Sequence, residues 1–299
     1  MKVAVGASSF ADETKKASLI LENHGIEFIK NPFGRRLTEE EIIEHLQGVD
    51  GLLAGLEPLN EKVFFSCPSL KAIARIGIGM DNVDLEAANK YGIKVSNTPN
   101  GPTDAVAEMT LSALLAIAHQ IIPSNNDIHK GIWKKRNGIS IKGLKILIVG
   151  YGHIGRKTAD LLKMLGAEIA IFDKYQEEVS TCEWEEGVAW ADVISLHASG
   201  KEEILSEREF GLMKRGVIIL NSARGPLVNE ECLYSKLNSN EVAWYWGDAL
   251  WKEPYNGKII ECENAILTPH ISTYTKQCRE EMETQAVKNL LEDLGYAGI

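Results

Sequence analysis

Residues 145–155 read Lys-Ile-Leu-Ile-Val-Gly-Tyr-Gly-His-Ile-Gly, and this stretch decides the fold of the second half of the chain. Its first five residues form an apolar run that predicts a buried β-strand. A GxGxxG pattern follows directly, and residues 156–165 after it predict a helix. A strand, a glycine turn and a helix in this order are typical of a dinucleotide-binding βαβ unit.

Each glycine of this turn has its own predicted role. Gly150 permits the tight turn, Gly152 lets the backbone approach a pyrophosphate at the helix N-terminus, and Gly155 allows close packing of helix on strand. Asp173 ends the next predicted strand and would accept hydrogen bonds from the adenosine ribose hydroxyls. An anionic Asp173 repels a 2′-phosphate, so the pattern favours NAD over NADP, although Lys174 beside it leaves an opening for phosphate. The alternative is a glycine turn that only packs a βα unit.

Strands and helices alternate along the rest of the chain as well. The predicted strands outside the opening stretch are 2–5, 51–54, 72–75, 94–96, 168–172, 192–196, 217–220 and 265–267, and the predicted helices are 14–24, 39–46, 85–91, 103–122 and 275–294. This alternation predicts parallel sheets covered on both faces. The helix at 103–122 is too apolar to be half solvated and follows the turn at 97–102, which predicts a first domain boundary there. The amphipathic helix at 275–294 is expected to pack back on the first domain.

Length and composition limit the class of protein. A chain of 299 residues supports roughly two domains, and 44% hydrophobic with 25% charged residues argues against both disorder and a membrane-embedded chain. The net charge of −10, without a Lys/Arg-rich stripe, argues against nucleic acid as a partner. No targeting segment or bilayer-length apolar run is evident, so a cytoplasmic protein is expected. Five scattered cysteines suggest reduced thiols and no metal site.

Three charged residues follow predicted strands of the second domain, where ligands bind in doubly wound folds: Arg224, Glu253 and His270. Hydride transfer to a 2-keto acid needs a cation for the carboxylate and carbonyl, which Arg supplies, and a proton donor, which His supplies. A carboxylate beside His270 would stabilise the imidazolium and orient its ring, which is the role predicted for Glu253. Singly, each could be a solvated turn residue, a loop charge or a strand-end histidine.

A glycine loop in the first domain adds a possible anion site. Arg75-Ile-Gly-Ile-Gly79 follows a predicted strand, and its backbone N–H groups could form a nest for a substrate carboxylate. The alternative is a plain glycine turn.

The chain resembles the D-isomer-specific 2-hydroxyacid dehydrogenases, a family that includes D-3-phosphoglycerate dehydrogenase. The resemblance runs from about residue 45 onward, and several motifs carry it in the same order. They are Arg75-Ile-Gly-Ile-Gly-Met-Asp-Asn-Val-Asp84, Asn97-Thr-Pro-Asn-Gly101, Ala105-Val-Ala-Glu108, the glycine turn, Asn221-Ser-Ala-Arg-Gly225, Glu253-Pro254 and Thr268-Pro-His270.

The resemblance implies an α/β fold of two doubly wound parallel-sheet domains with a cleft between them. A flavodoxin-like substrate-binding domain would comprise residues 1–97 and 272–299, and a Rossmann NAD-binding domain residues 98–271. It implies that Arg224 binds the substrate, that His270 is the acid/base and that Glu253 is its partner. The residues implied to hold the substrate carboxylate are Ile78 and Gly79, with Arg75 as added charge, and those implied to line the NAD site are His153, Ile154, Asp173, Ser222, Ala223 and Asp248. A helical arm over 103–133 would form a homodimer.

The sequence departs from the family pattern at three places. His197-Ala-Ser-Gly-Lys201 lacks the family's usual Pro, and Trp244-Tyr-Trp-Gly247 places large aromatics where small residues are usual. An unchanged core would be overpacked by them, so neighbouring residues must be smaller or the strand displaced. Gly55 stands where phosphoglycerate enzymes carry a phosphate-binding Arg, and formate dehydrogenases have Gln at the position of Glu253.

The sequence therefore predicts an NAD-dependent oxidoreductase that interconverts a D-2-hydroxy acid and its 2-keto acid. Two alternatives stay open. One is an NAD(H)-sensing, corepressor-like binding protein without significant turnover, because fold does not determine function. The other is a reductase that prefers NADP and acts on glyoxylate or hydroxypyruvate.

Overall fold

The structure, a computed structural model, describes residues 1–99 and 101–296. Asn100, within the predicted turn at 97–102, and residues 297–299, within the predicted segment 272–299, lie outside the described residues.

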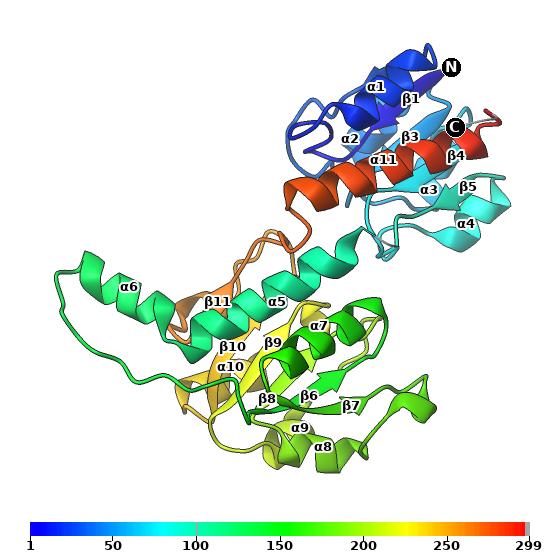
Figure 1. Ribbon diagram of the computed structural model, residues 1–299. Helices are drawn as coiled ribbons and strands as arrows, with labels where there is room; N and C mark the ends of the chain where they lie inside the picture. Colours follow the sequence, from blue (N-terminus) through cyan, green and yellow to red (C-terminus); the bar gives the residue numbers. More distant parts are fainter. Residues whose placement is uncertain (100, 297–299) are drawn as a thin grey trace. The chain divides into compact units, whose positions relative to one another are not determined.

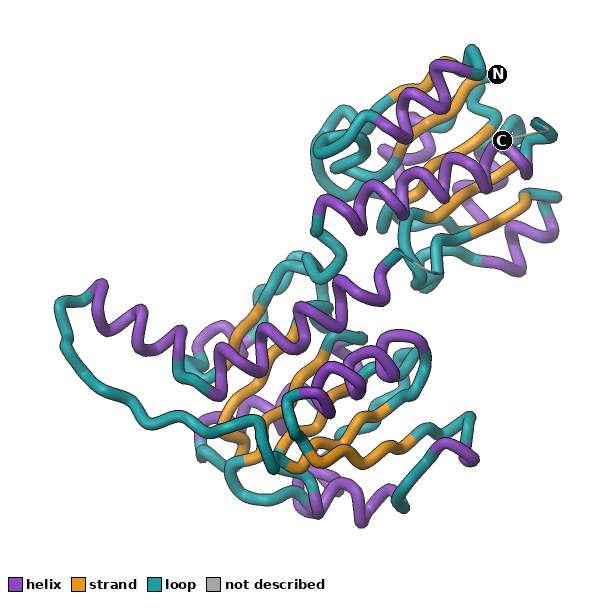
Figure 2. Tube along the Cα trace, in the orientation of Figure 1, coloured by secondary structure: helices purple, strands orange, loops and turns teal. Residues whose placement is uncertain are grey.

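The chain divides into two compact units. Unit 1 comprises Met1–Pro102 and Tyr274–Ile299, and unit 2 comprises Thr103–Thr273. The predicted boundaries after residues 97 and 271 fall slightly before the observed ones. Figure 2 shows the strands of each unit gathered side by side, with helices outside them.

Unit 1 is a parallel sheet between two layers of helices (Figure 1). Its elements are β1 (Lys2–Val5), α1 (Lys16–Asn23), β2 (Glu27–Ile29), α2 (Glu39–His45), β3 (Gly51–Ala54), α3 (Glu61–Ser66), β4 (Ala72–Arg75), α4 (Leu85–Lys90), β5 (Lys94–Ser96) and α11 (Lys276–Asp293). Among the described residues the sheet has five strands in the order β2-β1-β3-β4-β5, which is the order of the flavodoxin-like fold that the resemblance implies.

Helix α11 returns to unit 1 and covers the face of the sheet that it shares with α1. Its buried side chains are Cys278, Arg279, Met282, Glu283, Ala286, Val287, Leu290 and Leu291, and the four apolar positions at 282, 286, 287 and 290 follow the predicted helical spacing. A Cβ atom on Gly51 would lie 2.9 Å from a methyl group of Leu294, so the helix lies directly against β3. The predicted return of the last helix to the first domain is observed within unit 1.

Unit 2 repeats this architecture around a longer sheet (Figure 1). Its elements are α5 (Pro102–Ala118), α6 (Ile121–His129), β6 (Lys145–Val149), α7 (His153–Met164), β7 (Glu168–Phe172), α8 (Trp184–Trp190), β8 (Val193–Leu196), α9 (Glu207–Leu212), β9 (Val217–Asn221), α10 (Glu230–Asn238), β10 (Val242–Gly247), β11 (Ala265–Leu267) and short 3-10 turns at Glu177–Val179, Gly225–Leu227 and Lys258–Glu261. Over the described residues its six parallel strands run β11-β10-β9-β8-β6-β7. The strand order reverses between β6 and β8, directly beside the glycine turn.

Both faces of the unit 2 sheet are buried, which explains the continuous apolar run of β6. Leu147 and Val149 pack into the core beneath α8, α9 and α10, whereas Ile146 and Ile148 pack beneath α5 and α7. Alternate residues of one strand therefore enter two separate cores, as parallel sheets require. The predicted α/β class, with two doubly wound parallel sheets, is confirmed.

The prediction of a single helix over 103–122 is wrong at the C-terminal end of that range. Helix α5 ends at Ala118, and α6 begins at Ile121 after Gln120, which has a φ of +54°. Pro123 explains the break, because a proline in a continuing helix would lack its N–H and clash with the carbonyl four residues earlier, whereas the first turn of a new helix tolerates it. Over the described residues no single helix is long and apolar enough to span a membrane. The α5–α6 pair, bent by 61°, reaches that length and apolarity only when its two helices are counted together.

A bulge in β10 directly precedes the aromatic run at 244–246. Val242 pairs with Val217 and Trp244 with Ile218, so Ala243 is an extra residue in β10, that is, a bulge. Tyr245 and Trp246 are then fully buried on opposite faces of the sheet. A Cβ atom on Gly247 would lie 2.7 Å from the Tyr245 hydroxyl, so a small neighbour also makes room.

Candidate active site

The glycine turn of unit 2 leaves space at the N-terminus of α7. Gly150 has a φ of +89°, and a Cβ atom on Gly155 would lie 2.1 Å from the Gly150 carbonyl oxygen, so both positions require glycine. Gly152 is the N-cap of α7 and offers no side chain to its first N–H groups. A Cβ atom there would meet no described atom within 4 Å. The open space and the unsatisfied N–H groups fit a pyrophosphate.

Asp173, which directly follows β7, holds this turn through hydrogen bonds. Its carboxylate accepts hydrogen bonds from the backbone N–H groups of Tyr151 at 2.7 Å, Tyr175 at 2.9 Å and Gln176 at 3.1 Å. Because a carboxylate has about four acceptor positions, one remains for a ribose hydroxyl. Asp173 therefore shapes the turn itself, a role that its place in the sequence did not reveal. Lys174, next to it, forms an exposed ion pair with Glu202 at 3.4 Å.

His197 joins the ends of β8 and β9. Its Nε2 lies 2.8 Å from the Ser195 hydroxyl and its Nδ1 lies 2.9 Å from the Ser222 hydroxyl. Ser222 also donates to the Leu196 carbonyl at 3.2 Å, so a neutral ring with its proton on Nδ1 satisfies all three groups. Burial lowers the pKa of His197 to about 3. The departure at 197–201 thus begins with a neutral histidine that fixes Ser222, one of the predicted NAD-site residues.

We expect this histidine to make stability depend on pH. The unfolded chain binds a proton on His197 below about pH 6.5, whereas the folded protein resists protonation down to about pH 3. The stabilising contribution is therefore complete above pH 6.5 and is lost as the pH falls from 6.5 toward 3, by at most about 1.4 kcal/mol per pH unit. Urea unfolding at pH 7, 6 and 5 should show a smaller loss for His197→Asn than for the unmodified chain. Equal pH dependence of the two proteins would contradict this.

The turn after β9 carries Arg224. Asn221, fully buried at the strand end, accepts from the Ala223 N–H at 3.0 Å and donates to the Arg224 carbonyl at 2.7 Å. Arg224 is half-buried, and its Nη1 donates to the Ala223 carbonyl at 2.7 Å. The buried amide therefore determines how the backbone presents Ser222, Ala223 and Arg224.

His270 and Glu253 are brought together at the edge where β10 and β11 end. The His270 Nδ1 lies 3.1 and 3.2 Å from the two Glu253 carboxylate oxygens, and each side chain is about 30% exposed. Glu253 also accepts from the Leu250 N–H at 3.3 Å. Because Nδ1 faces the carboxylate, Nε2 is left for another partner. A half-exposed imidazole with a carboxylate behind it can donate and accept a proton.

The backbone of His270 has a φ of +56°, which non-glycine residues seldom adopt. Its N–H donates to the carbonyls of Asp248 and Thr268, both at 2.9 Å. The Asp248 side chain is 1% exposed and accepts from the N–H groups of Ile271 at 2.9 Å and Ser272 at 2.8 Å. Asp248, predicted to line the NAD site, thus holds the turn that carries His270.

The remaining predicted cofactor residues lie along the same edge of unit 2. His153 and Ile154 form the first turn of α7, the former exposed and the latter half-buried. The carboxyl ends of the strands therefore gather the glycine turn, Asp173, Ser222, Ala223, Arg224, Asp248, Glu253 and His270 on one unit.

The predicted anion loop lies in unit 1, after β4. Gly77 donates its N–H to the buried Thr98 hydroxyl at 2.7 Å, and Asn97 donates to the Ile78 carbonyl at 2.8 Å. None of the described residues accepts a hydrogen bond from the N–H group of Ile78 or of Gly79. Arg75 is 9% exposed, and its guanidinium donates to the Ile76 carbonyl at 2.5 Å. The loop is thus held rigidly while two N–H groups stay available for an anion.

Sequence reasoning missed a buried carboxylate beside this loop. Glu57 is fully buried near the end of β3, and both of its oxygens lie 3.0 Å from the Gly55 N–H. Burial raises the pKa of Glu57, and the charge of Arg75 acts in the opposite direction. A Cβ atom on Gly6 would collide with the carboxylate at 1.9 Å, so the small residues Gly6 and Gly55 make its room. No local signal in the sequence marks this carboxylate, because Gly6 follows a different strand, β1.

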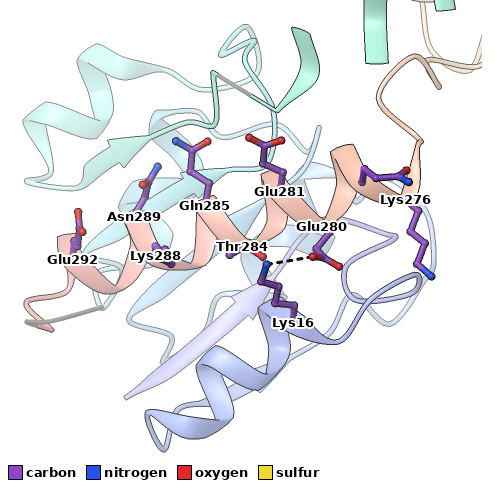
Figure 3. A pocket seen from close by; sticks show the side chains of 10 residues that line it. Lys16, Lys276, Glu280, Glu281, Thr284, Gln285, Lys288, Asn289 and Glu292 are labelled. Carbon is purple, nitrogen blue, oxygen red and sulfur yellow. Dashed lines mark hydrogen bonds and ion pairs between the residues drawn. The ribbon is translucent and has the colours of Figure 1, made fainter. Parts of the chain in front are cut away.

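A hollow follows the outer side of α11 in unit 1. Figure 3 shows Lys276, Lys288, Glu280, Glu281 and Glu292 along it, with Lys16 reaching Glu280 at 3.3 Å. Because charges of both signs alternate there and none of the predicted site residues lines it, this hollow is a solvated helix face. No group of three His, Cys, Asp or Glu side chains that could hold a metal ion occurs in the described part of the chain.

Comparison with known proteins gives a consistent set of relatives. Residues 111–272 match the family described as D-isomer specific 2-hydroxyacid dehydrogenase, NAD binding domain. A hydroxypyruvate reductase of Blautia hydrogenotrophica is 33% identical over 274 residues, which cover 85% of each chain. A glyoxylate reductase of Thermococcus litoralis is 32% identical over 271 residues, covering 84% of this chain and 82% of the relative.

A solved structure agrees with these relatives over nearly the whole length. The TT0316 protein from Thermus thermophilus has a TM-score of 0.87 and 31% identity, covering 98% of this chain and 97% of its own.

Proposed function

Because the chain belongs to the D-isomer specific 2-hydroxyacid dehydrogenase family, whose members are NAD(P)-dependent oxidoreductases, we propose that it interconverts a D-2-hydroxy acid and its 2-keto acid with NAD(H). The contact of His270 with Glu253 carries this proposal. The pair lies on the unit that holds the glycine turn, and it supplies the proton that hydride transfer to a carbonyl requires.

In this proposal each residue acts on the substrate directly or through its neighbour. When bound, the nicotinamide cofactor supplies or accepts a hydride at carbon 2 of the substrate. Protonated His270 donates from Nε2 to the keto oxygen during reduction, and neutral His270 takes the hydroxyl proton during oxidation. Glu253 stabilises the imidazolium and orients the ring through Nδ1. Arg224 binds the carboxylate and polarises the carbonyl.

The residues proposed to bind the cofactor lie in loops of unit 2, and further residues proposed to bind the substrate lie in a loop of unit 1. The first N–H groups of α7, at His153 and Ile154, would bind the pyrophosphate, with Ser222, Ala223 and Asp248 along the rest of the cofactor. In unit 1 the N–H groups of Ile78 and Gly79, beside Arg75, would bind the substrate carboxylate, which their rigid loop supports.

A panel of keto acids tests the activity. NADH oxidation is followed by loss of nicotinamide absorbance with hydroxypyruvate, glyoxylate, pyruvate, a branched-chain keto acid and 3-phosphohydroxypyruvate. The names of the two relatives make hydroxypyruvate and glyoxylate the first choices. Turnover of any of these keto acids supports the proposed oxidoreductase activity. Tight NADH binding without turnover of any would instead favour the NAD(H)-sensing protein, which does not need the His270–Glu253 pair.

We propose NADH as the preferred cofactor and expect its KM to be at least about tenfold below that of NADPH. The reason is that Asp173 would place a carboxylate against a 2′-phosphate, whereas Lys174 is already paired with Glu202. Asp173→Asn removes the charge and should narrow the ratio of the two KM values. Glu263→Gln, an exposed carboxylate elsewhere on unit 2, is the matched control and should leave the ratio of the two KM values unchanged. A lower KM for NADPH in the unmodified chain would favour the NADP-preferring reductase.

We also propose a homodimer that forms through the arm over 103–133. Figure 1 shows α6 and the segment after it extending away from the rest of unit 2. Ile121 and Ile128 are each 54% exposed and Trp133 is 86% exposed, an unusual amount of apolar surface for one segment. A second copy of the chain would cover it. Sedimentation should give twice the chain mass, and Trp133→Glu should shift the protein toward the monomer.

A further inference from the structure

The indole of Trp246 makes a hydrogen bond that reaches the turn of His270. Trp246 is fully buried near the end of β10, and its Nε1 lies 3.2 Å from the Thr268 hydroxyl oxygen. Thr268 follows β11, the strand paired with β10 (Figure 1). Since an indole N–H can only donate, the Thr268 oxygen is the acceptor.

The hydroxyl proton of Thr268 then has one strong acceptor. The Thr268 oxygen lies 2.6 Å from the Asp248 carboxylate, against 3.5 Å from the Gly247 carbonyl. A hydroxyl has a single proton, so Thr268 donates it to the carboxylate while it accepts from Trp246. Successive bonds of this kind polarise one another, and the one to the charged group is the strongest. Trp246, Thr268 and Asp248 therefore form a directed relay.

The relay ends at the backbone of the candidate acid/base and of the two residues that follow it. The Asp248 carboxylate accepts the N–H groups of Ile271 and Ser272, and the Asp248 carbonyl accepts the N–H of His270. His270 keeps a φ of +56°, a backbone conformation that persists only where the surroundings hold it. We propose that Trp246 and Thr268 are positioning residues for proton transfer, acting through Asp248 to hold the His270 side chain in place. This inference rests on the proposed function.

Two substitutions at Thr268 test the relay. Thr268→Val keeps the shape and removes the hydroxyl, so kcat should fall about tenfold while the NADH Kd changes less than twofold. Thr268→Ser keeps the hydroxyl and should restore kcat to within about twofold of the unmodified protein. If both substitutions lower kcat equally, or if neither does, the hydroxyl is not a positioning group and the relay is overturned.

Trp246→Phe tests the donor at the start of the relay. It keeps a buried ring and removes the N–H, and it should lower kcat severalfold without raising the NADH Kd. Trp244→Phe, two residues earlier on the same face of β10, is the matched control and should leave kcat unchanged. In the double variant Trp246→Phe/Thr268→Val the losses should be clearly less than additive, because both interrupt one chain. Fully additive losses would show independent packing effects and overturn the relay.

Amide hydrogen exchange gives a readout that needs no turnover. Amide exchange at His270, Ile271 and Ser272 should be faster in Thr268→Val and Trp246→Phe, and stay unchanged in Thr268→Ser and Trp244→Phe. If exchange is faster in Thr268→Val and Trp246→Phe but the unmodified chain turns over no keto acid, the proposed function is refuted. The hydrogen-bond relay would then remain as a structural feature alone. Unchanged exchange in both Thr268→Val and Trp246→Phe would refute the relay, whatever the activity.

Discussion

His270→Asn should lower kcat by about three orders of magnitude and leave the NADH Kd within about twofold. The reason is that general acid–base catalysis contributes about 100- to 10,000-fold, and Asn can neither give nor take the proton at neutral pH. Asn is the better replacement than Ala because it tolerates the φ of +56° found at this position. The measurement is steady-state kinetics with the preferred keto acid, together with NADH binding by fluorescence.

Two further variants separate chemistry from folding in this experiment. His270→Ala also removes the imidazole but adds backbone strain, so a drop in kcat seen with Ala and not with Asn would assign the loss to the backbone. Glu253→Gln keeps the side-chain shape and removes the charge that faces His270, and should give an intermediate loss of kcat. A parallel loss of NADH binding in His270→Asn would argue against the acid/base role.

Arg224→Lys should lower kcat/KM for the keto acid by about 100- to 1,000-fold. Lysine keeps the positive charge but lacks the planar fork that meets a carboxylate with two parallel hydrogen bonds, and loss of one such donor in a site costs about this factor. The expected pattern is a higher KM for the keto acid with a lower kcat, because the same group binds the carboxylate and polarises the carbonyl. NADH binding should stay unchanged.

Arg208→Gln is the matched control for this prediction. Arg208 belongs to the same unit and forms an exposed ion pair with Glu185 at 2.6 Å. Surface pairs of this kind contribute little, so kcat/KM should be unaffected. If Arg224→Lys kept the full kcat/KM, charge alone would suffice at this position and the proposed fork would be wrong.

The parts of the site that sequence reasoning could find are those in which local pattern and chemistry coincide. The glycine turn can be recognised in the sequence because Gly150 and Gly155 have a fixed spacing within one βα unit. The structure shows that neither position has room for a Cβ atom. His270 and Glu253 could be paired because both follow parallel strands, whose carboxyl ends meet at one edge. Their contact at 3.1 Å is the structure's contribution.

The parts that sequence reasoning missed depend on contacts between distant segments. In the sequence His197 is only the start of a departure from the family pattern. Its contact with Ser222, which follows β9 and lies 2.9 Å away, depends on the fold. The aromatic run around Trp246 reads as overpacking because the bulge at Ala243 cannot be seen without the register of β9. Glu57 was not singled out, since nothing nearby in the sequence indicates that Gly6 leaves room for its carboxylate.

The return of α11 to unit 1 has a consequence for synthesis on the ribosome. The first 102 residues and the helix at Lys276–Asp293 belong to one unit, but all of Thr103–Thr273 is translated between them. At about 5–20 residues per second this interval lasts roughly 10 to 30 s. During that time unit 2 can fold as a continuous segment, while the sheet face that receives Leu290 and Leu291 stays without its cover. The unit that emerges first is thus completed last.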